Sequence, residues 1–358
     1  MTLKKAEKYF IGLFSVSLGL ASCLLIAALV GENPFFVLFA LIHGAFGSLS
    51  DLGYTLFYTT PLIFTGLSVA VAFHCGLFNI GSEGQLYMGA LALTALGILL
   101  PQLPLAPVLG ILAAFAGGAA WGAIAGALKS YRGSHEVIVT IMLNFVSYSI
   151  VGFCILHVFK NPNSQNPETS LLGKAYSLPG LGDISVQSPL NGAFIFALLV
   201  ALGVWFILFK TPWGFEIRMA GSSPETALRS GIPLRRRLVE AMAFSGGLSG
   251  LVAVNEIMGF AHKFRDQFSV GYGFIGIAVA LLGRNRPLGI VMAALLFGAL
   301  QKGSLALELD TEKITRDLAG VMQALIILFV ASETFWLGLV TAIRRRLTVK
   351  AREETGSR

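Results

Sequence analysis

Long stretches without a charged residue limit the fold of this chain more than any other feature of its sequence. Residues 9–31, 52–82, 84–128, 137–159 and 184–209 contain no Asp, Glu, Lys or Arg. A helix needs about 20 mostly apolar residues to cross a membrane, and each stretch is long enough. Charged residues make up only 13% of the chain, against roughly 25% in soluble domains. The composition excludes a soluble or disordered chain, and three scattered cysteines exclude a disulfide scaffold.

The longest of these stretches, 84–128, has room for two spans, because Pro101, Pro104 and Pro107 interrupt it with a turn. The sequence thus predicts an all-α polytopic membrane protein that forms a single transmembrane domain over residues 1–358. About ten spans are expected, at about residues 9–30, 55–74, 84–100, 106–128, 137–159, 191–209, 238–258, 272–283, 287–303 and 317–341.

The basic residues predict how these spans are oriented. With the N-terminus in the cytoplasm and alternating spans, 19 Lys and Arg residues fall inside and 7 outside, which places the C-terminus inside as well. The net charge of +7 therefore reflects the orientation of the spans. It does not indicate nucleic-acid binding, since basic and aromatic residues form no shared face. The first apolar run reaches Val30, longer than a cleaved signal peptide allows, so we expect an uncleaved first span.

The expected spans form two groups of opposite sense. The first group, about 55–159, begins outside, and the second, about 238–341, begins inside. Four spans followed by four of opposite sense is the layout of an inverted repeat, a common transporter architecture. Two other segments lie outside the spans. The apolar part of 32–54, residues 35–46, predicts an interfacial or re-entrant helix, and 160–190 predicts an external loop able to contact another protein.

A third segment, 210–237, is expected in the cytoplasm and specifies a short helix. Ser223 suits the N-cap and Pro224 the first helical position, while Gly231 suits the C-terminal cap and Pro233 prevents continuation. These signals predict a helix of about two turns over 224–230. A helix that short is marginal alone in water. It is either a capped connector or a mechanical contact with a cytoplasmic partner.

Several catalytic motifs are missing from the sequence. It contains no P-loop pattern and no H-E-x-x-H, and its five histidines are dispersed. Residues 271–276, GYGFIG, match the dinucleotide-binding spacing but lead into apolar membrane sequence rather than a βαβ unit. We therefore expect no metal site, no catalytic residue and no cofactor on this chain. If transport uses ATP, a partner chain hydrolyses it.

Polar residues inside the expected spans are candidates for function, because they are costly in a membrane. The densest group lies in 76–85, between the second and third spans, and carries no Lys or Arg. Such a glycine-flanked break at membrane depth is stable only when protein or a water-filled cavity surrounds it. Each candidate is either a substrate contact or an interhelical hydrogen bond. The candidates for the substrate path are Asn79, Ser82, Glu83, Gln85, Asn144, Asn255 and Glu256.

Glycines spaced four residues apart predict close packing of two spans. Small residues at this spacing allow helix backbones to approach one another. We expect this packing role, rather than a substrate role, for Gly118, Gly122, Gly126, Gly246 and Gly250.

Four stretches together carry a resemblance to a known family. Residues 66–90 (GLSVAVAFHCGLFNIGSEGQLYMGA), 134–148 (SHEVIVTIMLNFVSY), 221–233 (GSSPETALRSGIP) and 271–289 (GYGFIGIAVALLGRNRPLG) resemble the permease subunits of bacterial ABC importers. The nucleoside and simple-sugar branch is the most similar, within a family that also includes ribose and branched-chain amino-acid permeases. The resemblance covers about residues 10–340.

This resemblance implies a permease subunit that forms the path for a nucleoside-like or simple-sugar solute. It implies a homodimer or heterodimer of permeases, cytoplasmic ABC ATPases that use ATP, and an external solute-binding protein. It also implies a location in the bacterial cytoplasmic (inner) membrane. Closure of the ATPases would push on the helix at 223–231 and rock the two halves. The residues that match the coupling segment are Gly221, Ser223, Pro224, Glu225, Ala227 and Gly231.

Two other hypotheses remain open from the sequence. A stand-alone secondary transporter driven by an ion gradient would also use inverted repeats and a broken helix, with Glu83 as its ion or proton site. A membrane-embedded enzyme would need paired catalytic groups, for which Glu83 and Glu256 are the plausible carboxylates. The expected alternation of spans places these two near opposite faces of the membrane.

Overall fold

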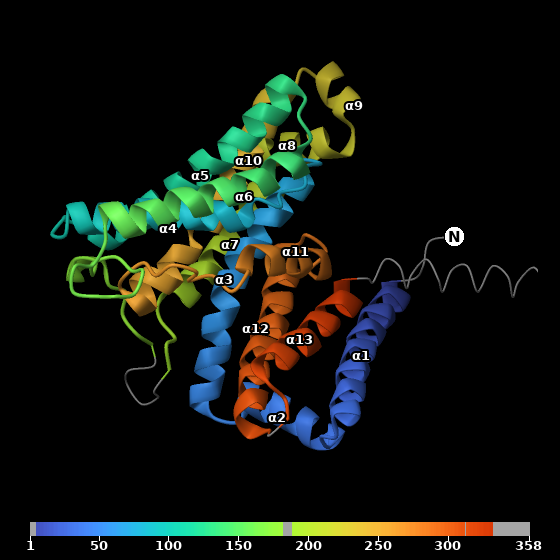
Figure 1. Ribbon diagram of the computed structural model, residues 1–358. Helices are drawn as coiled ribbons and strands as arrows, with labels where there is room; N and C mark the ends of the chain where they lie inside the picture. Colours follow the sequence, from blue (N-terminus) through green and yellow to red (C-terminus); the bar gives the residue numbers. More distant parts are fainter. Residues whose placement is uncertain (1–4, 182–187, 312, 332–358) are drawn as a thin grey trace, which may run out of the picture. The chain divides into compact units, whose positions relative to one another are not determined.

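The structure is a computed structural model that describes residues 5–181, 188–311 and 313–331 (Figure 1). Its regular elements are helices, and the described residues contain no strand beyond isolated bridges. The chain divides into two compact units, one formed by Met1–Gly44 with Gly303–Arg358 and the other by Ala45–Lys302. Six described helices are long and apolar enough to cross a membrane, so the predicted all-helical membrane fold is confirmed at this level. They are Leu49–His74, Ala106–Arg132, Glu136–Val158, Ala193–Lys210, Leu234–Ala261 and Pro287–Asp310.

In the first unit, α1 (Lys5–Val30) packs against α13 (Arg316–Ala331). The short apolar segment predicted at 35–46 is helical as α2 (Pro34–Phe46). Lys313, just before α13, links that helix to the end of α1, because its ammonium donates to the carbonyl of Gly31 at 3.0 Å. The last predicted span, 317–341, is present as α13 up to residue 331, and its remainder lies outside the described residues.

The second unit contains most of the helices. They are α3 (Leu49–His74), α4 (Ser82–Leu99), α5 (Ala106–Arg132), α6 (Glu136–Phe153), α7 (Ala193–Lys210), α8 (Pro212–Ser222), α9 (Pro224–Arg229), α10 (Leu234–Gly250) and α11 (Tyr272–Leu282). Short π-helical segments continue α6 over Cys154–Val158 and follow α10 over Val254–Ala261, and a 3-10 turn covers Lys174–Tyr176. The last long helix, α12 (Pro287–Asp310), begins in this unit. Of the six long helices, α3 and α10 are the most buried, so they form the centre of the unit.

Two predicted helix boundaries were wrong for the same physical reason. We expected the second span to begin at 55, but α3 begins at Leu49, because Ser48 caps it and Asp51 lies in its first turn. We expected another span to end at 303, but α12 continues to Asp310. Lys302 of α12 pairs with Asp51 at 2.9 Å, so charges that suggested span ends are neutralised within the unit.

Candidate functional site

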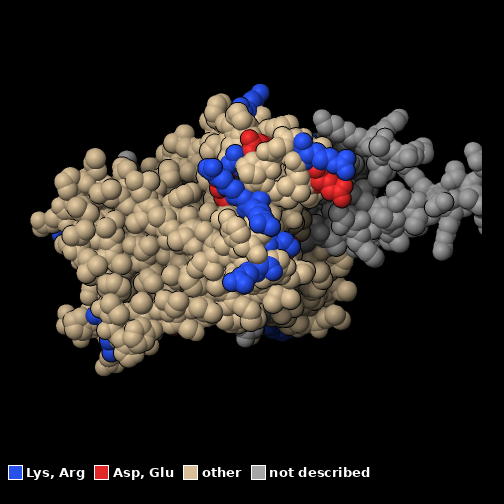
Figure 2. Space-filling model, turned by 90° about the horizontal axis from the view of Figure 1, so that it is seen from above, with Lys and Arg blue, Asp and Glu red and all other residues tan. Residues whose placement is uncertain are grey.

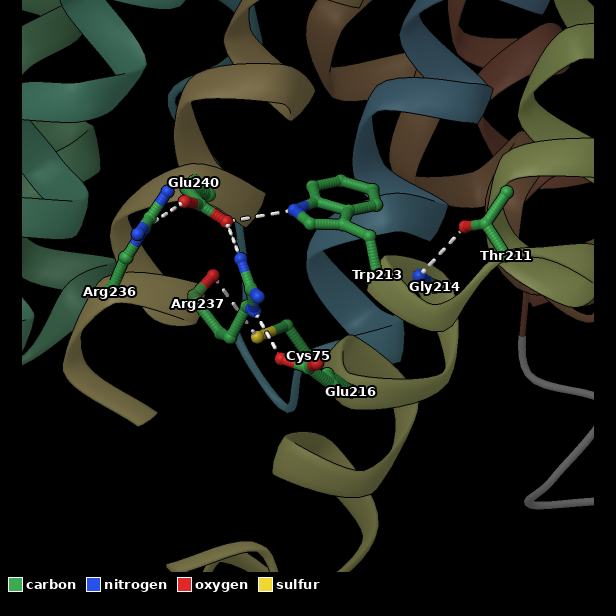
Figure 3. Close-up of polar contacts among 8 residues, drawn as sticks. All are labelled: Cys75, Thr211, Trp213, Gly214, Glu216, Arg236, Arg237 and Glu240. Carbon is green, nitrogen blue, oxygen red and sulfur yellow. Dashed lines mark hydrogen bonds and ion pairs between the residues drawn. The ribbon is translucent and has the colours of Figure 1, made fainter. Parts of the chain in front are cut away.

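The α8–α9 element follows α7 and begins with a well-formed cap. Thr211 occupies the N-cap of α8, where its hydroxyl oxygen accepts the N–H of Gly214 at 3.2 Å, and Pro212 takes the first helical position (Figure 3). We did not predict α8 from the sequence, because it is short, interrupted by glycine, and carries both Glu216 and Arg218. Its existence depends on contacts with distant parts of the chain.

Those contacts are ion pairs and hydrogen bonds that fasten α8 to the first turns of α10. The Arg237 guanidinium donates to Glu216 of α8 at 2.6 Å and also pairs with Glu240. Trp213 of α8 donates its indole N–H to Glu240 at 2.8 Å (Figure 3). Arg236 pairs with the other oxygen of Glu240 at 2.6 Å, but its side chain is 73% exposed, against 15% for Arg237. Arg237 therefore contributes more than Arg236 to holding α8 on α10.

The helix predicted over 224–230 is present as α9, and its capping differs in one detail. Gly231 ends it with a positive φ of +78°, and the N–H of Ile232 reaches back to the carbonyl of Ala227 at 3.0 Å. Ser223 occupies the N-cap, but its hydroxyl bonds to the hydroxyl of Thr226 at 2.8 Å instead of a backbone N–H. Ala227 is the one fully buried side chain of α9, whereas Leu228 is 58% exposed. The helix thus presents nearly all of its surface to the outside of the unit.

Basic side chains gather around this element. Figure 2, which looks onto the end of the molecule that carries α9, shows Lys and Arg in a band with only a few acidic residues. The helix ends that meet here supply exposed basic residues, which are Arg132, Lys210, Arg229, Arg235, Arg236, Arg284 and Arg286. We call this part of the second unit the α9 end.

The loop after α3 is anchored at the α9 end. Gly76 has a φ of +72°, which a side chain would strain, and it packs on the backbone of Gly221 in α8, where a side chain would collide. The Cys75 sulfur lies 3.8 Å from the carbonyl oxygen of Arg237 (Figure 3). The His74 ring hydrogen-bonds the carbonyl of Asn285, just after α11, at 2.9 Å. Residues 74–76 therefore join α8, α10 and the end of α11.

From this anchor the chain turns back into the interior of the unit. Asn79 is fully buried, donates to Gln85 and to Ser245 of α10, each at 2.8 Å, and accepts a bond from Gln85 at 3.1 Å. Ser82, the first residue of α4, bonds to Ser249 of α10 at 2.6 Å. Ser249 lies about 18 Å along α10 from Arg237, at 1.5 Å per residue. The start of α4 is therefore deep within the bundle and not at its surface.

Helix α11 begins next to the start of α4. The N–H of Gly273 donates to the Glu83 carboxylate at 2.6 Å, and the Glu83 side chain also bonds Ser269. With 11 residues, α11 is about 16 Å long, roughly half of the hydrocarbon thickness of a membrane. It ends at the α9 end, where Asn285 meets His74. The first turns of α4 and α11 thus meet inside the bundle, and Glu83 lies between them.

The remaining polar candidates form two groups. Asn144 of α6 supports the break by donating to the carbonyl of Ile80 at 3.0 Å and accepting the N–H of Gly84 at 2.8 Å. Asn255 donates to Glu256 at 3.2 Å, and Glu256 in turn bonds the Tyr272 hydroxyl.

The structure thus joins Asn79, Ser82, Glu83, Gln85 and Asn144 around one break and places Asn255 and Glu256 beside it. All seven are at most 8% exposed. The expectation that Glu83 and Glu256 lie near opposite faces was wrong, because they contact the consecutive residues Gly273 and Tyr272. Counting alternate spans assumed that every helix begins at a membrane surface, which α4 and α11 do not.

The glycines singled out for packing lie where α5 crosses α10. A side-chain carbon at Gly118 would come within 3.0 Å of the carbonyl oxygen of Gly246, and one at Gly122 within 3.0 Å of that of Met242. A side-chain carbon at Gly126 would lie 2.9 Å from the Met242 Cβ and from the Val239 Cα, and one at Gly250 would strike the carbonyl oxygen of Ala114. The two helix backbones are in direct contact, which holds Ser245 and Ser249 of α10 in line with the break.

Sequence reasoning missed the partners that complete both sites. Ser245 and Ser249 bond Ser68 of α3 as well as the break, and their spacing of four residues on an apolar helix was a signal that could have found them. Trp213, Glu216 and Glu240 gave no such signal, because their pairing depends on how α8 folds back on α10.

The class of protein that these features define is a transport protein, built from membrane helices with a buried break and an exposed short helix. Comparison with known proteins identifies the family: residues 52–331 match the branched-chain amino acid transport system / permease component family, and the chain belongs to it. It is 36% identical to the guanosine ABC transporter permease protein NupP of Bacillus subtilis, over 92% of this chain and 95% of that protein. It is 34% identical to the nucleoside ABC transporter permease protein NupB of Lactococcus lactis, over 91% and 92% of the two chains.

A more distant relative is the D-allose transport system permease protein AlsC of Escherichia coli, 28% identical over 78% of this chain and 85% of that protein. The chain is therefore an ABC transporter permease subunit, a multi-pass protein of the cytoplasmic membrane, as the resemblance implied. Its relatives are named as transport permeases and not as enzymes, which also favours this assignment over an ion-coupled transporter.

Proposed function

We propose that this chain is one of two membrane subunits of an ATP-driven importer for a nucleoside-like or simple-sugar solute, and that α9 couples it to an ATPase on a separate chain. The exposed surface of α9 carries this proposal. A six-residue helix cannot stabilise itself in water, yet the fold buries only Ala227 of it and leaves Leu228 uncovered. A partner that covers Leu228 gives both the helix and its caps a function. ATP is then used by that partner, and this chain binds no cofactor.

Nucleosides are the solutes that the comparisons favour most. Two relatives that match over more than nine-tenths of this chain are named for guanosine and nucleosides, whereas a glucose permease protein of Haloferax volcanii is 31% identical over 80%. The simple-sugar alternative remains within the proposal. An external solute-binding protein would supply the solute, with the loop at 160–190 as its contact.

A sister permease is the proposed membrane partner. Bacillus subtilis has a second guanosine permease protein, NupQ, which is 34% identical over 70% of this chain, and Lactococcus lactis has NupC at 29% over 68%. This chain matches NupP and NupB over a longer part of its length than it matches those second proteins. We therefore propose a heterodimer in which this chain takes the position of NupP.

The proposed topology keeps about ten spans in one domain over residues 1–358, with inverted halves at about 55–159 and 238–341 and both termini in the cytoplasm. The basic band at the α9 end supports this orientation by the positive-inside rule. The coupling loop 210–237 is then cytoplasmic. The solute path would pass the break at 76–85, where the polar candidates are paired with one another. Solute would therefore reach them only when α4 and α11 separate.

The test is uptake of radiolabelled guanosine by cells that express the complete transporter with an altered α9. The variant carries Glu225→Lys, Leu228→Asp and Arg229→Glu, which change only exposed positions. We expect uptake to fall at least about tenfold and the ATPase to be lost on purification, while the amount of chain in the membrane is unchanged. Leu171→Asp, an equally exposed change in the loop at 160–190, is the matched control for ATPase binding. Uptake by this chain alone in liposomes, abolished by an ionophore, would contradict the proposal.

A further inference from the structure

Helix α11 is held at both of its ends by one short stretch of chain. Glu83 accepts the N–H of Gly273 in the first turn of α11 at 2.6 Å. His74 bonds the carbonyl of Asn285, directly after the last turn, at 2.9 Å. The described residues between these two contacts are only 75–82. The position of α11 is therefore tied to the path of this stretch.

Glu83 is suited to hold the start of α11 because it stabilises the N-termini of two helices, α4 and α11. It lies in the first turn of α4, and its carboxylate faces the first turn of α11. The N-terminus of each helix carries unpaired N–H groups and a partial positive charge, which a carboxylate stabilises. Its side chain is 3% exposed and also bonds Ser269, so the buried group is well supplied with donors.

The close approach at this point depends on a glycine. A side-chain carbon at Gly273 would lie 2.7 Å from the Cα of Glu83 and collide with its backbone. This close approach allows the Glu83 carboxylate to reach the N–H of Gly273, and through this bond a shift of α4 displaces the start of α11.

The other end of the same stretch rests on α8. Gly76 and Gly221 are in backbone contact, so a side chain on Gly221 would strike the carbonyl of His74 and the N–H of Gly76. Since α8 and α9 are joined only through Ser223, a displacement of α9 reaches this contact directly. Residues 74–83 therefore connect the α9 end to the interior start of α11.

We propose that Glu83 is a positioning residue that makes α11 follow α8 and α9, with residues 74–83 as the linkage. This inference rests on the proposed function, because it assigns the route by which closure of the ATPase reaches the solute path. Without the Glu83 carboxylate, the ATPase still closes and hydrolyses ATP, but the start of α11 no longer moves with α4. ATP hydrolysis and import then become separated.

The experiment compares Glu83→Ala, Glu83→Gln and wild type as complete complexes in proteoliposomes, with guanosine as the solute. We expect Glu83→Ala to leave assembly and ATPase rate within about twofold while guanosine imported per ATP falls at least about fivefold. Glu83→Gln should restore part of this ratio, because its amide oxygen still accepts an N–H, in a weaker neutral bond. Glu136→Ala is the matched control, since Glu136 lies in the first turn of α6 and pairs only with Lys129 at 2.7 Å among the ion pairs of the described residues.

Proportional loss of assembly, ATPase rate and import in Glu83→Ala would overturn the inference, as would an unchanged ratio. If Glu83→Ala does not assemble, Glu83→Gln alone decides, and its guanosine imported per ATP should be at least about twofold lower than that of wild type. An unchanged ratio in that variant also contradicts the proposal.

A spin-label pair tests the linkage without measuring transport. One label replaces Ser230, directly after α9, and the other Phe274 of α11, both exposed, in a chain whose native cysteines are replaced by alanine. A non-hydrolysable ATP analogue should shift their distance distribution differently in wild type and Glu83→Ala. Identical shifts refute the linkage. Failure of the wild-type complex to import with ATP refutes the proposed function instead, and the label pair still reports on Glu83.

Discussion

The break at 76–85 and helix α9 look alike in sequence and behave oppositely in the structure. Both are short, and both are bounded by glycine and rich in polar residues. In the break, Asn79, Ser82 and Glu83 are at most 3% exposed and bonded to other helices. In α9, only Ala227 is buried. The difference shows that buried partners, not local composition, decide which region is held inside the fold and which stays exposed.

The largest effect should follow from filling the space beside the break. A side chain at Gly84 would lie 2.7 Å from the Asn144 amide oxygen and 2.7 Å from the Ser147 hydroxyl. We expect Gly84→Val to destabilise the protein by about 3 kcal/mol, through overpacking and through loss of the Asn144 bond. Thermal inactivation followed by fluorescence size-exclusion chromatography measures this effect.

The control for that experiment is Gly152→Val, because nothing lies within 4 Å of a side chain at Gly152 in α6. If both variants lose the same stability, the break is no more tightly packed than the periphery of the unit. The contrast between a buried break and an exposed α9 would then be wrong.

An intermediate effect is expected where the interior meets the exposed element. Arg237→Gln removes the bonds to Glu216 and Glu240 that hold α8 on α10, whereas Arg236→Gln removes one exposed pair. We expect a loss of about 1–2 kcal/mol for Arg237→Gln and less than about 0.5 kcal/mol for Arg236→Gln. The difference in melting temperature between the two variants measures the contribution of Arg237 to stability. Equal losses of stability would show that α8 is held by other contacts.

The smallest effect should appear in the loop at 160–190, which extends the comparison to a third region. Hydrogen bonding to Lys263 and then to Ser164 holds the pKa of Glu168 below its usual value. Because the pKa is depressed in the folded state, the anchoring of this loop is complete above the ordinary pKa of Glu, about 4.3, and is lost as pH falls through the folded value. Glu168→Gln should show faster hydrogen exchange than wild type over 160–176 at pH 7.

That excess should disappear at the acidic end of the titration, after correction of both chains for intrinsic exchange rates. Exchange over 79–85 should stay the same in the two proteins at every pH. A difference between them that persists below the folded pKa would mean that Glu168 anchors the loop by its shape and not by its charge.

The sequence predicted the helical class, the short helix at 224–230 and the protein-enclosed break, because each leaves a local signal. Gly231 and Pro224 have backbone preferences that hold in any surroundings. The absence of Lys and Arg in 76–85 favours a buried segment over a solvated loop. It could not predict α8, since Trp213 and Glu216 find their partners only after the chain folds back. It also could not predict the depth at which α11 begins, because hydropathy reports the length of an apolar run and not where its ends lie.

The burial of Ala227 alone has a consequence for how α9 can diverge among related transporters. Its other positions make no contribution to the core, and exposed substitutions of this kind usually change stability by less than about 0.5 kcal/mol. Glu225, Leu228 and Arg229 can therefore be replaced together with the matching residues of another ATPase at little risk to folding. Under the proposed coupling, exchanging these three residues should change which ATPase the chain binds without changing its fold.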